Sequence, residues 1–306
     1  MGTSVRDDRT ALSVAASAAV IRLATRGSTL ARAQAALAEA ALRANGAGPV
    51  DTVVVRTIGD RQATVPLDRL TGQGWFTAEL ERAIVDGRAD IAVHSAKDLP
   101  TDYEPGLEIA ALLERGDARD AVVTRDGATL ASLRAGSTVG TSSTRRAALM
   151  SVLWPALRPV PMRGNVDTRL RALAAGKVDA LIVACAGVDR LGMGDRIAER
   201  LDPTVFVPAP AQGAIALEAR TGSEPAGLAA RLAHGPTVAA VTAERALLAA
   251  LGGGCLLPLG AWARIEHGRL VLSAALGVGA TVRRAELEGD PADPARLGHR
   301  LARLLG

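Results

Sequence analysis

The chain has 306 residues, of which 48% are hydrophobic and only 2% are aromatic. This length suffices for two or three domains, and their cores must be built from aliphatic side chains. The net charge of +4 and the lack of basic runs with interleaved aromatics do not indicate a nucleic-acid partner. No apolar run approaches the roughly 20 residues of a membrane span, and two cysteines cannot form a disulfide framework. We therefore expect a cytoplasmic protein with neither a membrane nor a nucleic acid as partner.

The first 18 residues carry a short alanine-rich stretch that faintly resembles a signal peptide. Asp7 and Asp8 lie among the charges before it, and cleavage would cut close to the first strand. We therefore predict a disordered N-terminal extension over residues 1–18 instead.

Strand-like and helix-like segments alternate from about residue 20 to 220, which predicts α/β domains with largely parallel sheets. In chain order, the apolar patterns predict a first series of strands at 20–25, 50–57 and 89–96, with helices at 29–45 and 77–87. A crossing segment at 107–124 leads to a second series, with strands near 137–143, 158–164 and 178–187 and helices at 145–153 and 166–176. The stretch 203–220 is rich in proline and glycine before it becomes strand-like, so we expect the chain to return there to the first domain. Two crossings would make a hinged cleft, which is a usual place for a ligand.

The pattern changes from about residue 236 onward. A helix at 237–251 ends in a glycine-rich segment, three strand-like runs at 260–289 predict an antiparallel meander, and a last helix covers 293–305. We predict domain 1 at 19–114 and 214–232, domain 2 at 115–213, and a small α+β domain 3 at 236–306.

In open α/β sheets, ligands bind where strands end and helices begin. The residues at these junctions include one carboxylate, Asp98, among six arginines and one lysine: Arg26, Lys97, Arg145, Arg146, Arg163, Arg169 and Arg190. Guanidinium groups bind carboxylates in a bidentate manner, so these junctions predict a site for a ligand with several negative charges.

The segment "GTSSTRR" at 140–146 is typical of such a junction. Ser142 and Ser143 suit a helix N-cap, and we expect the guanidinium groups of Arg145 and Arg146 to converge outward from the turn. The alternative is a capped helix whose arginines merely face water.

Four motifs in one order, "HSAKDLP", "GTSSTRR", "RGNVDTR" and "GGGCLLPLG", resemble those of the porphobilinogen deaminase family. The segments "ATRGSTLARAQ", "PAPAQGAIALE" and "VTAERALL" fit as well, so the resemblance runs from about Ile21 to the last helix.

The resemblance implies two α/β domains like those of a type II periplasmic binding protein, with the active site in the cleft between them, and a small C-terminal α+β domain. It implies hydroxymethylbilane synthase activity, in which four porphobilinogen molecules condense head to tail with release of ammonia. It also implies a monomer and a dipyrromethane cofactor held by a thioether to Cys255. We expect no metal site.

Residue roles follow from the same resemblance. Asp98 matches the catalytic carboxylate, which can stabilise the electron-poor pyrrole left when ammonia departs and can relay protons. The matched cofactor-binding residues are Cys255, Lys97, Ser143, Arg145, Arg146, Arg163 and Arg169, and the matched substrate-binding residues are Arg26, Ser28, Arg190 and Phe76.

Some residues in these motifs have a purely structural interpretation. We expect His94 to be a packed strand residue and Cys185 to be a buried core residue. Residues 56–76 match the family's mobile active-site loop, although Arg69 and Gln73 stand where many relatives have lysines.

Two alternatives remain at this stage. A non-enzymatic two-lobed anion-binding protein would need the arginines and capped helices but neither Asp98 nor Cys255. An inactive relative of the deaminases is the other.

Overall fold

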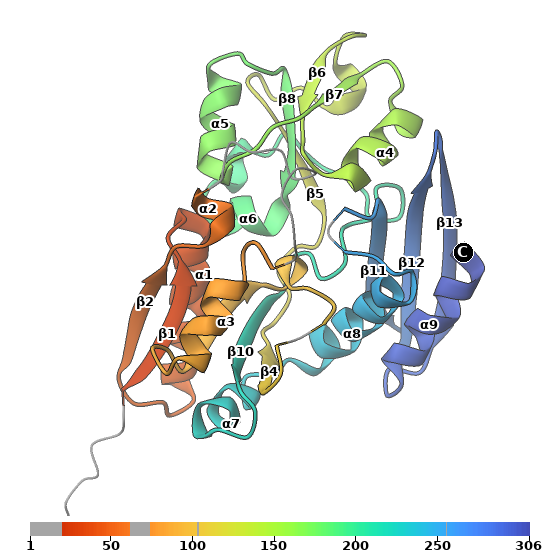
Figure 1. Cartoon of the computed structure of the whole chain (residues 1–306). Helices are drawn as coiled ribbons and strands as arrows, with labels where there is room; N and C mark the ends of the chain where they lie inside the picture. The colour runs from red at the N-terminus through yellow and green to blue at the C-terminus, as the bar shows by residue number, and fades with distance from the viewer. Residues whose placement is uncertain (1–19, 62–73, 103, 255) are drawn as a thin grey trace, which may run out of the picture.

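The structure is a computed structural model that describes residues 20–61, 74–102, 104–254 and 256–306. The predicted N-terminal extension, the loop residues 62–73 with Arg69 and Gln73, and Cys255 lie outside the described residues. Two five-stranded sheets and one three-stranded sheet, each with helices packed on it, make up the fold (Figure 1). The architecture is therefore the expected one, with two α/β units and a small α+β unit.

The first sheet has the strand order β2-β1-β3-β10-β4. Its strands are β1 (Ile21–Arg26), β2 (Val50–Val55), β3 (Ile91–Ser95), β4 (Leu107–Leu112) and β10 (Ile215–Arg220). Strands β1, β2 and β3 pair in parallel, whereas β10 is antiparallel to both β3 and β4. The sheet is largely parallel, as predicted, but one strand runs in the opposite direction because it belongs to the returning chain.

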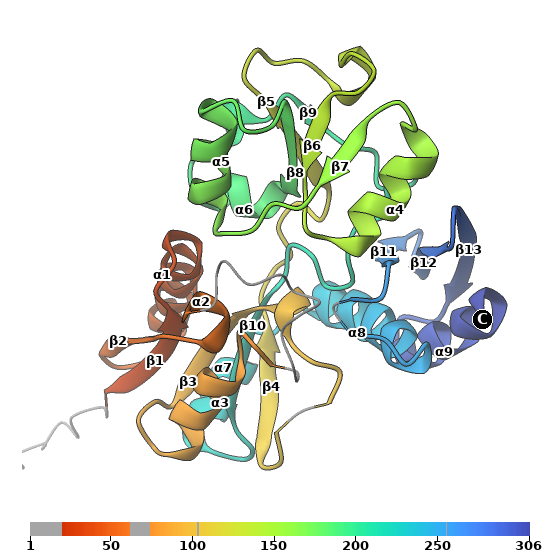
Figure 2. The ribbon, with the colours of Figure 1, turned by 45° about the horizontal axis from the view of Figure 1, so that its top comes forward.

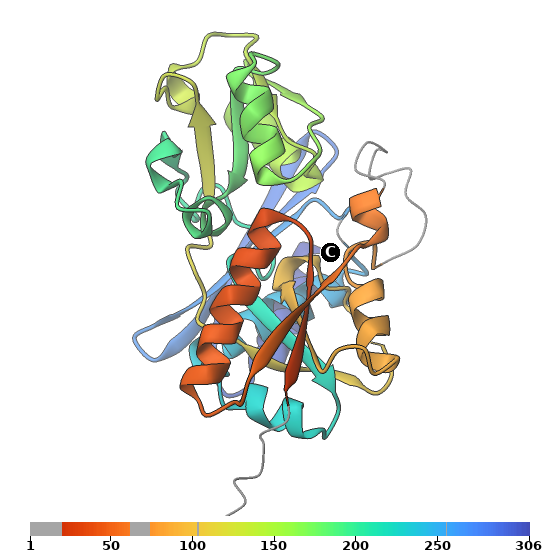
Figure 3. The same ribbon diagram turned by 90° about the vertical axis from the view of Figure 1, so that its left-hand side faces the viewer.

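The helices of the first unit lie on both faces of this sheet (Figure 3). Leu23 and Val93 face α1 (Thr29–Ala44) and α7 (Glu224–Ala230), while the intervening Ala24 and Ala92 face α3 (Ala78–Val85). This alternation follows from the two-residue period of a strand. A short helix, α2 (Ile58–Arg61), follows β2.

The second sheet repeats the same pattern, with the order β7-β6-β8-β5-β9. Its strands are β5 (Asp120–Thr124), β6 (Thr138–Gly140), β7 (Arg158–Val160), β8 (Ala180–Ala184) and β9 (Glu199–Arg200). Here β5 is the strand that runs antiparallel to its neighbours β8 and β9. Helix α4 (Thr144–Leu153) covers one face, and α5 (Val166–Ala174) and α6 (Cys185–Arg190) cover the other.

The C-terminal unit is the antiparallel meander predicted from the sequence. Strands β11 (Leu259–Glu266), β12 (Arg269–Val278) and β13 (Thr281–Gly289) pair in chain order, and α8 (Gly235–Ala250) and α9 (Pro294–Leu305) pack on one face. The other face of this sheet is directed toward α4 (Figure 2), and Ala275 and Trp262 join the core that contains Leu149 and Met150 of that helix. None of the helices in the described ranges is long and apolar enough to cross a membrane.

Two segments connect the α/β units, at 113–119 and 201–214, and they touch where they cross. Gly116 donates a backbone hydrogen bond to Gly213 at 3.1 Å, and a Cβ atom on Gly213 would lie 2.7 Å from the carbonyl oxygen of Gly116. The φ of +90° at Gly213 also favours glycine. The close approach therefore requires glycine at this position.

A buried ion pair joins this crossing to the C-terminal unit. Glu244 of α8 is fully buried and accepts hydrogen bonds from both terminal nitrogens of Arg115, at 2.7 and 3.1 Å. It also accepts from the backbone N–H groups of Ala211 at 2.6 Å and Ala263 at 2.7 Å. One carboxylate thus ties both connecting segments to α8 and β11.

Candidate active site

The turn that carries Lys97 and Asp98 follows β3 directly as the short 3-10 helix η2 (Ala96–Asp98). Ala96 is buried, and its N–H donates to the carbonyl of Ala214 ahead of β10 at 3.1 Å. Arg245 of α8 then donates to the carbonyl oxygens of Leu99 and Pro100. The half-buried Asp98 is therefore held from both sides by neighbouring elements.

The segment "GTSSTRR" joins β6 to α4 as the sequence predicts. Ser143 is the N-cap, and its hydroxyl accepts a hydrogen bond from the N–H of Arg146 at 3.3 Å. The hydroxyl of Thr141 accepts from the N–H of Ser143 at 3.2 Å. These local hydrogen bonds fix the helix start and thereby the direction of both arginines.

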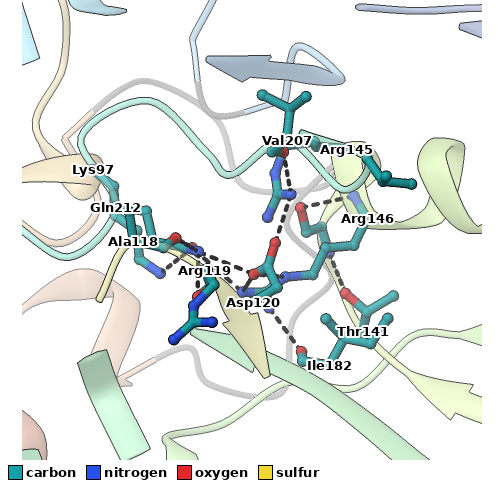
Figure 4. Close-up of polar contacts among 12 residues, drawn as sticks. Lys97, Ala118, Arg119, Asp120, Thr141, Arg145, Arg146, Ile182, Val207 and Gln212 are labelled. Atoms are coloured by element: carbon teal, nitrogen blue, oxygen red, sulfur yellow. Dashed lines mark hydrogen bonds and ion pairs between the residues drawn. The ribbon is translucent and has the colours of Figure 1, made fainter. Parts of the chain in front are cut away.

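Arg145 and Arg146 turn inward, so the expectation that they point outward is wrong. Only 3% of Arg145 and 6% of Arg146 are exposed. Both pair with the fully buried Asp120 at the start of β5, Arg145 through Nη1 to Oδ2 at 2.7 Å and Arg146 through Nη2 to Oδ1 at 2.7 Å (Figure 4). Two buried guanidinium groups are far more stable beside a carboxylate than without one, and Asp120 supplies that charge.

The electrostatics of this cluster follow from burial and from the adjacent guanidinium groups. Burial by itself raises the pKa of Asp120, but Arg145 and Arg146 outweigh it and hold this pKa well below its usual range. Burial lowers the pKa of Arg145, and Arg146 adds to this effect. One carboxylate facing two guanidinium groups leaves the cluster with an excess of positive charge.

Lys97 extends the cluster from the first unit. Its Nζ donates to Oε1 of the buried Gln212 at 3.3 Å, and Arg146 Nη2 approaches the same oxygen at 3.5 Å. Burial, followed by the charge of Arg146, lowers the pKa of Lys97 to about 8, although Asp98 and Asp120 oppose this. Cations from both α/β units therefore lie close together.

Arg163 lies on the segment between β7 and α5, and Arg169 lies in the first turns of α5. Arg169 Nε donates to the carbonyl of Gly164 at 2.8 Å. Burial lowers the pKa of Arg169 to about 10, with smaller contributions from Arg146 and Arg163, while Asp98 opposes the shift. Arg169 is therefore close enough to both Asp98 and Arg146 to be coupled to them electrostatically, and burial lowers the pKa of Arg163 as well.

Arg26 ends β1, Ser28 precedes α1, and Phe76 is the last residue of the predicted loop. The guanidinium carbon of Arg26 lies 4.3 Å from the centroid of the Phe76 ring, which is a cation–π contact. The Phe76 ring also packs against the Cα side of Gly59, where a Cβ atom would collide with it. Ser28 is the N-cap of α1 and accepts from the N–H of Ala31 at 3.2 Å, so its observed contact is a local one.

Arg190 lies at the crossing of the connecting segments, where its Nη2 donates to the carbonyl of Gly213 at 2.6 Å. It also lines a surface hollow of about 430 Å³ together with Leu37, Leu113 and Arg231. The structure does not bring Arg190 into the Asp120 cluster.

Leu256, which follows Cys255 in the chain, contacts the N-terminus of α4. The hydroxyl of Thr144, the first residue of α4, donates to the carbonyl of Leu256 at 2.9 Å. On the other side of Cys255, a Cβ atom on Gly254 would meet no atom within 4 Å. Leu256 is thus hydrogen-bonded to the turn that positions Arg145 and Arg146.

The structural interpretations of His94 and Cys185 are confirmed. Cys185 is fully buried, and burial raises the pKa of its thiol to about 12. His94 is packed in β3, where its Nε2 lies 2.9 Å from Oε2 of the buried Glu218.

Asp120 and Gln212 are the residues of this site that sequence reasoning missed. Asp120 is the first residue of an antiparallel strand, and Gln212 lies just before another. The beginning of an antiparallel strand lies at the same edge as the ends of its parallel neighbours. Asp120 pairs with Ala184 at the end of β8, and Ile215 of β10 pairs with Ser95 at the end of β3. An acid that opens a wholly apolar strand, "DAVV", was the available signal.

Comparison with known proteins identifies the family. Residues 21–226 match the model described as "Porphobilinogen deaminase, dipyromethane cofactor binding domain", and residues 238–306 match the porphobilinogen deaminase C-terminal domain. The chain belongs to the porphobilinogen deaminase family. The porphobilinogen deaminase of Acidothermus cellulolyticus is 49% identical over 298 residues, covering 95% of this chain and 90% of that protein. The one from Mycobacterium leprae is 53% identical over 247 residues, covering 80% and 78%.

Comparison with solved structures gives matches of lower sequence identity than these deaminases. A domain of BvgS from Bordetella pertussis is 19% identical with a TM-score of 0.41, and covers 70% of this chain and 86% of its own. A TRAP periplasmic solute binding protein from Desulfovibrio salexigens is 13% identical with a TM-score of 0.40, and covers 71% and 72%.

The residues near α4 fit the dipyrromethane cofactor of the deaminase family. This group carries carboxylate side chains and therefore needs hydrogen-bond donors and positive charge. The buried Ser142 Oγ and Arg145 Nε have no hydrogen-bond partner among the described residues. Unpaired buried donors are costly, so these two atoms favour an anionic group at this position.

Proposed function

We propose that the chain is a hydroxymethylbilane synthase that condenses four porphobilinogen molecules head to tail and releases ammonia in tetrapyrrole biosynthesis. The observation that carries this proposal is that three parts of the chain meet at the N-terminus of α4. Lys97 and Asp98 come from the first unit, Arg145 and Arg146 from the second, and Thr144 contacts Leu256 beside Cys255. A reaction that extends an anchored, multiply charged chain needs this combination.

The cations of the site are proposed to bind the acetate and propionate groups of porphobilinogen. Each added pyrrole brings two carboxylates, and guanidinium groups hold carboxylates through paired hydrogen bonds. We assign this role to Lys97, Arg146 and Arg169, with Arg145 contributing its unpaired Nε. Arg163, Arg190, Arg26, Ser28 and Phe76 are assigned to further substrate and cofactor contacts on the basis of the family motifs.

Asp98 is proposed to act on the reacting pyrrole. Loss of ammonia leaves a cationic, azafulvenium-like ring, which a fixed carboxylate near the ring N–H stabilises. In its protonated form this group can give a proton to the departing amine, and the carboxylate that remains can accept one from the attacked carbon. Asp98 opposes the lowering of the pKa values of both Lys97 and Arg169, so it lies within electrostatic reach of the cations assigned to substrate carboxylates.

Cys255 and its surroundings are proposed to hold the dipyrromethane cofactor. When bound through the Cys255 thioether, the cofactor supplies the primer to which the pyrroles are added. We assign the orientation of this group to Ser142, Ser143 and Arg145 at the start of α4, because Ser142 Oγ and Arg145 Nε have no hydrogen-bond partner among the described residues. Cys185 is excluded as the attachment point, since its thiol is buried and its pKa is raised to about 12.

Intact mass and colour test this function together. We expect the purified protein to exceed its sequence mass by two pyrrole units and to give the colour of a dipyrromethane with acidic Ehrlich's reagent. Cys255→Ser should lose both signals because it removes the thiol nucleophile, while Cys185→Ser should keep them. A two-lobed anion-binding protein would show neither signal, so an unmodified wild-type mass after expression in cells that make porphobilinogen would contradict the proposal.

Turnover should fall at alkaline pH as Lys97 loses its proton. With a pKa of about 8, this side chain is charged below that pH and becomes neutral above it, so it binds carboxylates only in the lower range. We expect kcat/KM to decline by up to about tenfold for each unit above pH 8, as for loss of one essential proton. In Lys97→Arg the cation persists, and this decline should move to higher pH. An unchanged profile in that variant would assign the decline to another group.

A further inference from the structure

The side chain of Gln212 occupies the junction between the two α/β units. It lies on the segment that returns to the first unit and is fully buried. Its Oε1 accepts from Lys97 Nζ of the first unit at 3.3 Å and lies 3.5 Å from Arg146 Nη2 of the second (Figure 4). One amide thus contacts carboxylate-binding cations of both units.

The other end of this amide faces only acceptors. Gln212 Nε2 donates to the carbonyls of Ala118 at 2.8 Å and Arg119 at 3.2 Å, and to Oδ1 of Asp120 at 3.1 Å. An amide has one accepting and one donating end, and here cations surround the first and oxygens surround the second. Only this orientation satisfies both ends, so a side chain of different polarity would lose one set of contacts.

The backbone around Gln212 is held as firmly as its side chain. The carbonyl of Gln212 accepts from Arg115 Nε at 2.8 Å, and Gly213 packs against Gly116. The preceding Ala211 has a φ of +60° and donates its N–H to the buried Glu244. A non-glycine residue tolerates this conformation only where its surroundings impose it. These backbone contacts therefore fix the position of the Gln212 amide at the junction.

We propose that Gln212 is a positioning residue that sets the place and the charge of Lys97 relative to Arg146 and Asp120, so that the carboxylate-binding groups of the two units act as one site. The proposal rests on the proposed function, in which Lys97 and Arg146 bind substrate carboxylates. It adds a residue that acts through its contacts with Lys97 and Arg146.

The charge of Lys97 is the property that reports this role. The ionisable groups that act on it are Asp98 of η2, Asp120 of β5, and Arg145 and Arg146 of α4. Substitution of Gln212 removes none of these four residues, whereas the neutral acceptor 3.3 Å from Lys97 Nζ is lost or gains a charge. Removal of the acceptor disfavours the ammonium form, and a carboxylate in its place favours that form.

The chain offers a direct measurement, because Lys97 and the exposed Lys177 are its only lysines. Holoenzyme labelled with ¹³C at lysine Cε should give two resonances, assigned with Lys177→Arg, whose shifts are followed against pH. In Gln212→Met we expect the midpoint of Lys97 to fall by roughly half a unit or more, and in Gln212→Glu to rise by a similar amount. Lys177 is the internal control and should titrate identically in all three proteins.

The pH dependence of kcat/KM provides a second measurement of the Lys97 titration. The alkaline decline of kcat/KM should move in the same direction as the Lys97 midpoint in each variant, and KM should change more than kcat. A merely structural role would lower stability without shifts of opposite sign. Equal Lys97 midpoints in the wild-type protein and both folded variants would overturn the proposal. Turnover and cofactor mass of the wild-type protein test the proposed synthase function separately. Failure of the Gln212 proposal can therefore be distinguished from failure of the proposed function.

Discussion

Asp98→Asn should retain the fold and the cofactor mass but lose nearly all turnover. Asparagine keeps the size of the side chain but removes the negative charge that stabilises a cationic pyrrole and the group that accepts a proton. Loss of a general acid–base group or of a preorganised charge lowers rates by roughly 10²- to 10⁴-fold. Single-turnover and steady-state assays, with intact mass on the same samples, give the measurement.

Asp102→Asn is the matched control, because Asp102 is an exposed aspartate four residues further along the same segment. It should keep kcat close to that of the wild-type protein. If Asp98→Asn retained a kcat within a few-fold of wild type while carrying the full cofactor mass, the assigned role of Asp98 would be wrong.

Asp120→Asn should be among the most destabilising single substitutions in this chain. It leaves the buried Arg145 and Arg146 without their shared carboxylate, and removal of one member of a buried ion pair costs about 3–5 kcal/mol. For a protein of this size we expect Tm to fall on the order of 10 °C, measured by thermal unfolding. The control Asp86→Asn breaks an exposed pair with Arg88 and should cost at most about 1 kcal/mol.

The pH dependence of stability gives the same residue a second test. The pKa of Asp120 is depressed in the folded protein, so its contribution is complete above the ordinary aspartate pKa of about 3.9 and is lost as pH falls through the lower folded value. The free energy of unfolding should therefore depend on pH below about 4 less steeply in Asp120→Asn than in the wild-type protein. Equal Tm values for Asp120→Asn and Asp86→Asn at neutral pH would show that the cluster does not stabilise the fold.

Local features of this site could be predicted because they depend on neighbouring residues. Ser28 and Ser143 cap helices through hydrogen bonds that span three residues, and the motif "HSAKD" places Asp98 directly after a strand. Alternating apolar residues also sufficed for the C-terminal meander, where each strand pairs with the next in the chain. The assignment of domain boundaries from these patterns remains a prediction.

The direction of the two arginines could not be predicted in the same way. A capped helix start fixes where the side chains of Arg145 and Arg146 leave the backbone, but whether they meet solvent or a carboxylate depends on what packs above them. Asp120 is 25 residues from Arg145 in sequence. It reaches the arginines only because β5 is antiparallel to β8, which brings its first residue to the edge where the parallel strands end.

The sequence by itself determined the family, the order of the elements, the capped helix starts and the placement of Asp98, Lys97 and the arginines at strand ends. Each of these depends on residues close together in the chain or on motifs in a fixed order. Only the tertiary structure decided that Asp120 offsets part of the positive charge of Arg145 and Arg146. It also decided that Gln212 contacts both Arg146 and Lys97. Asp120 and Gln212 arrive on segments that cross between the units, and buried charges choose partners by proximity in space.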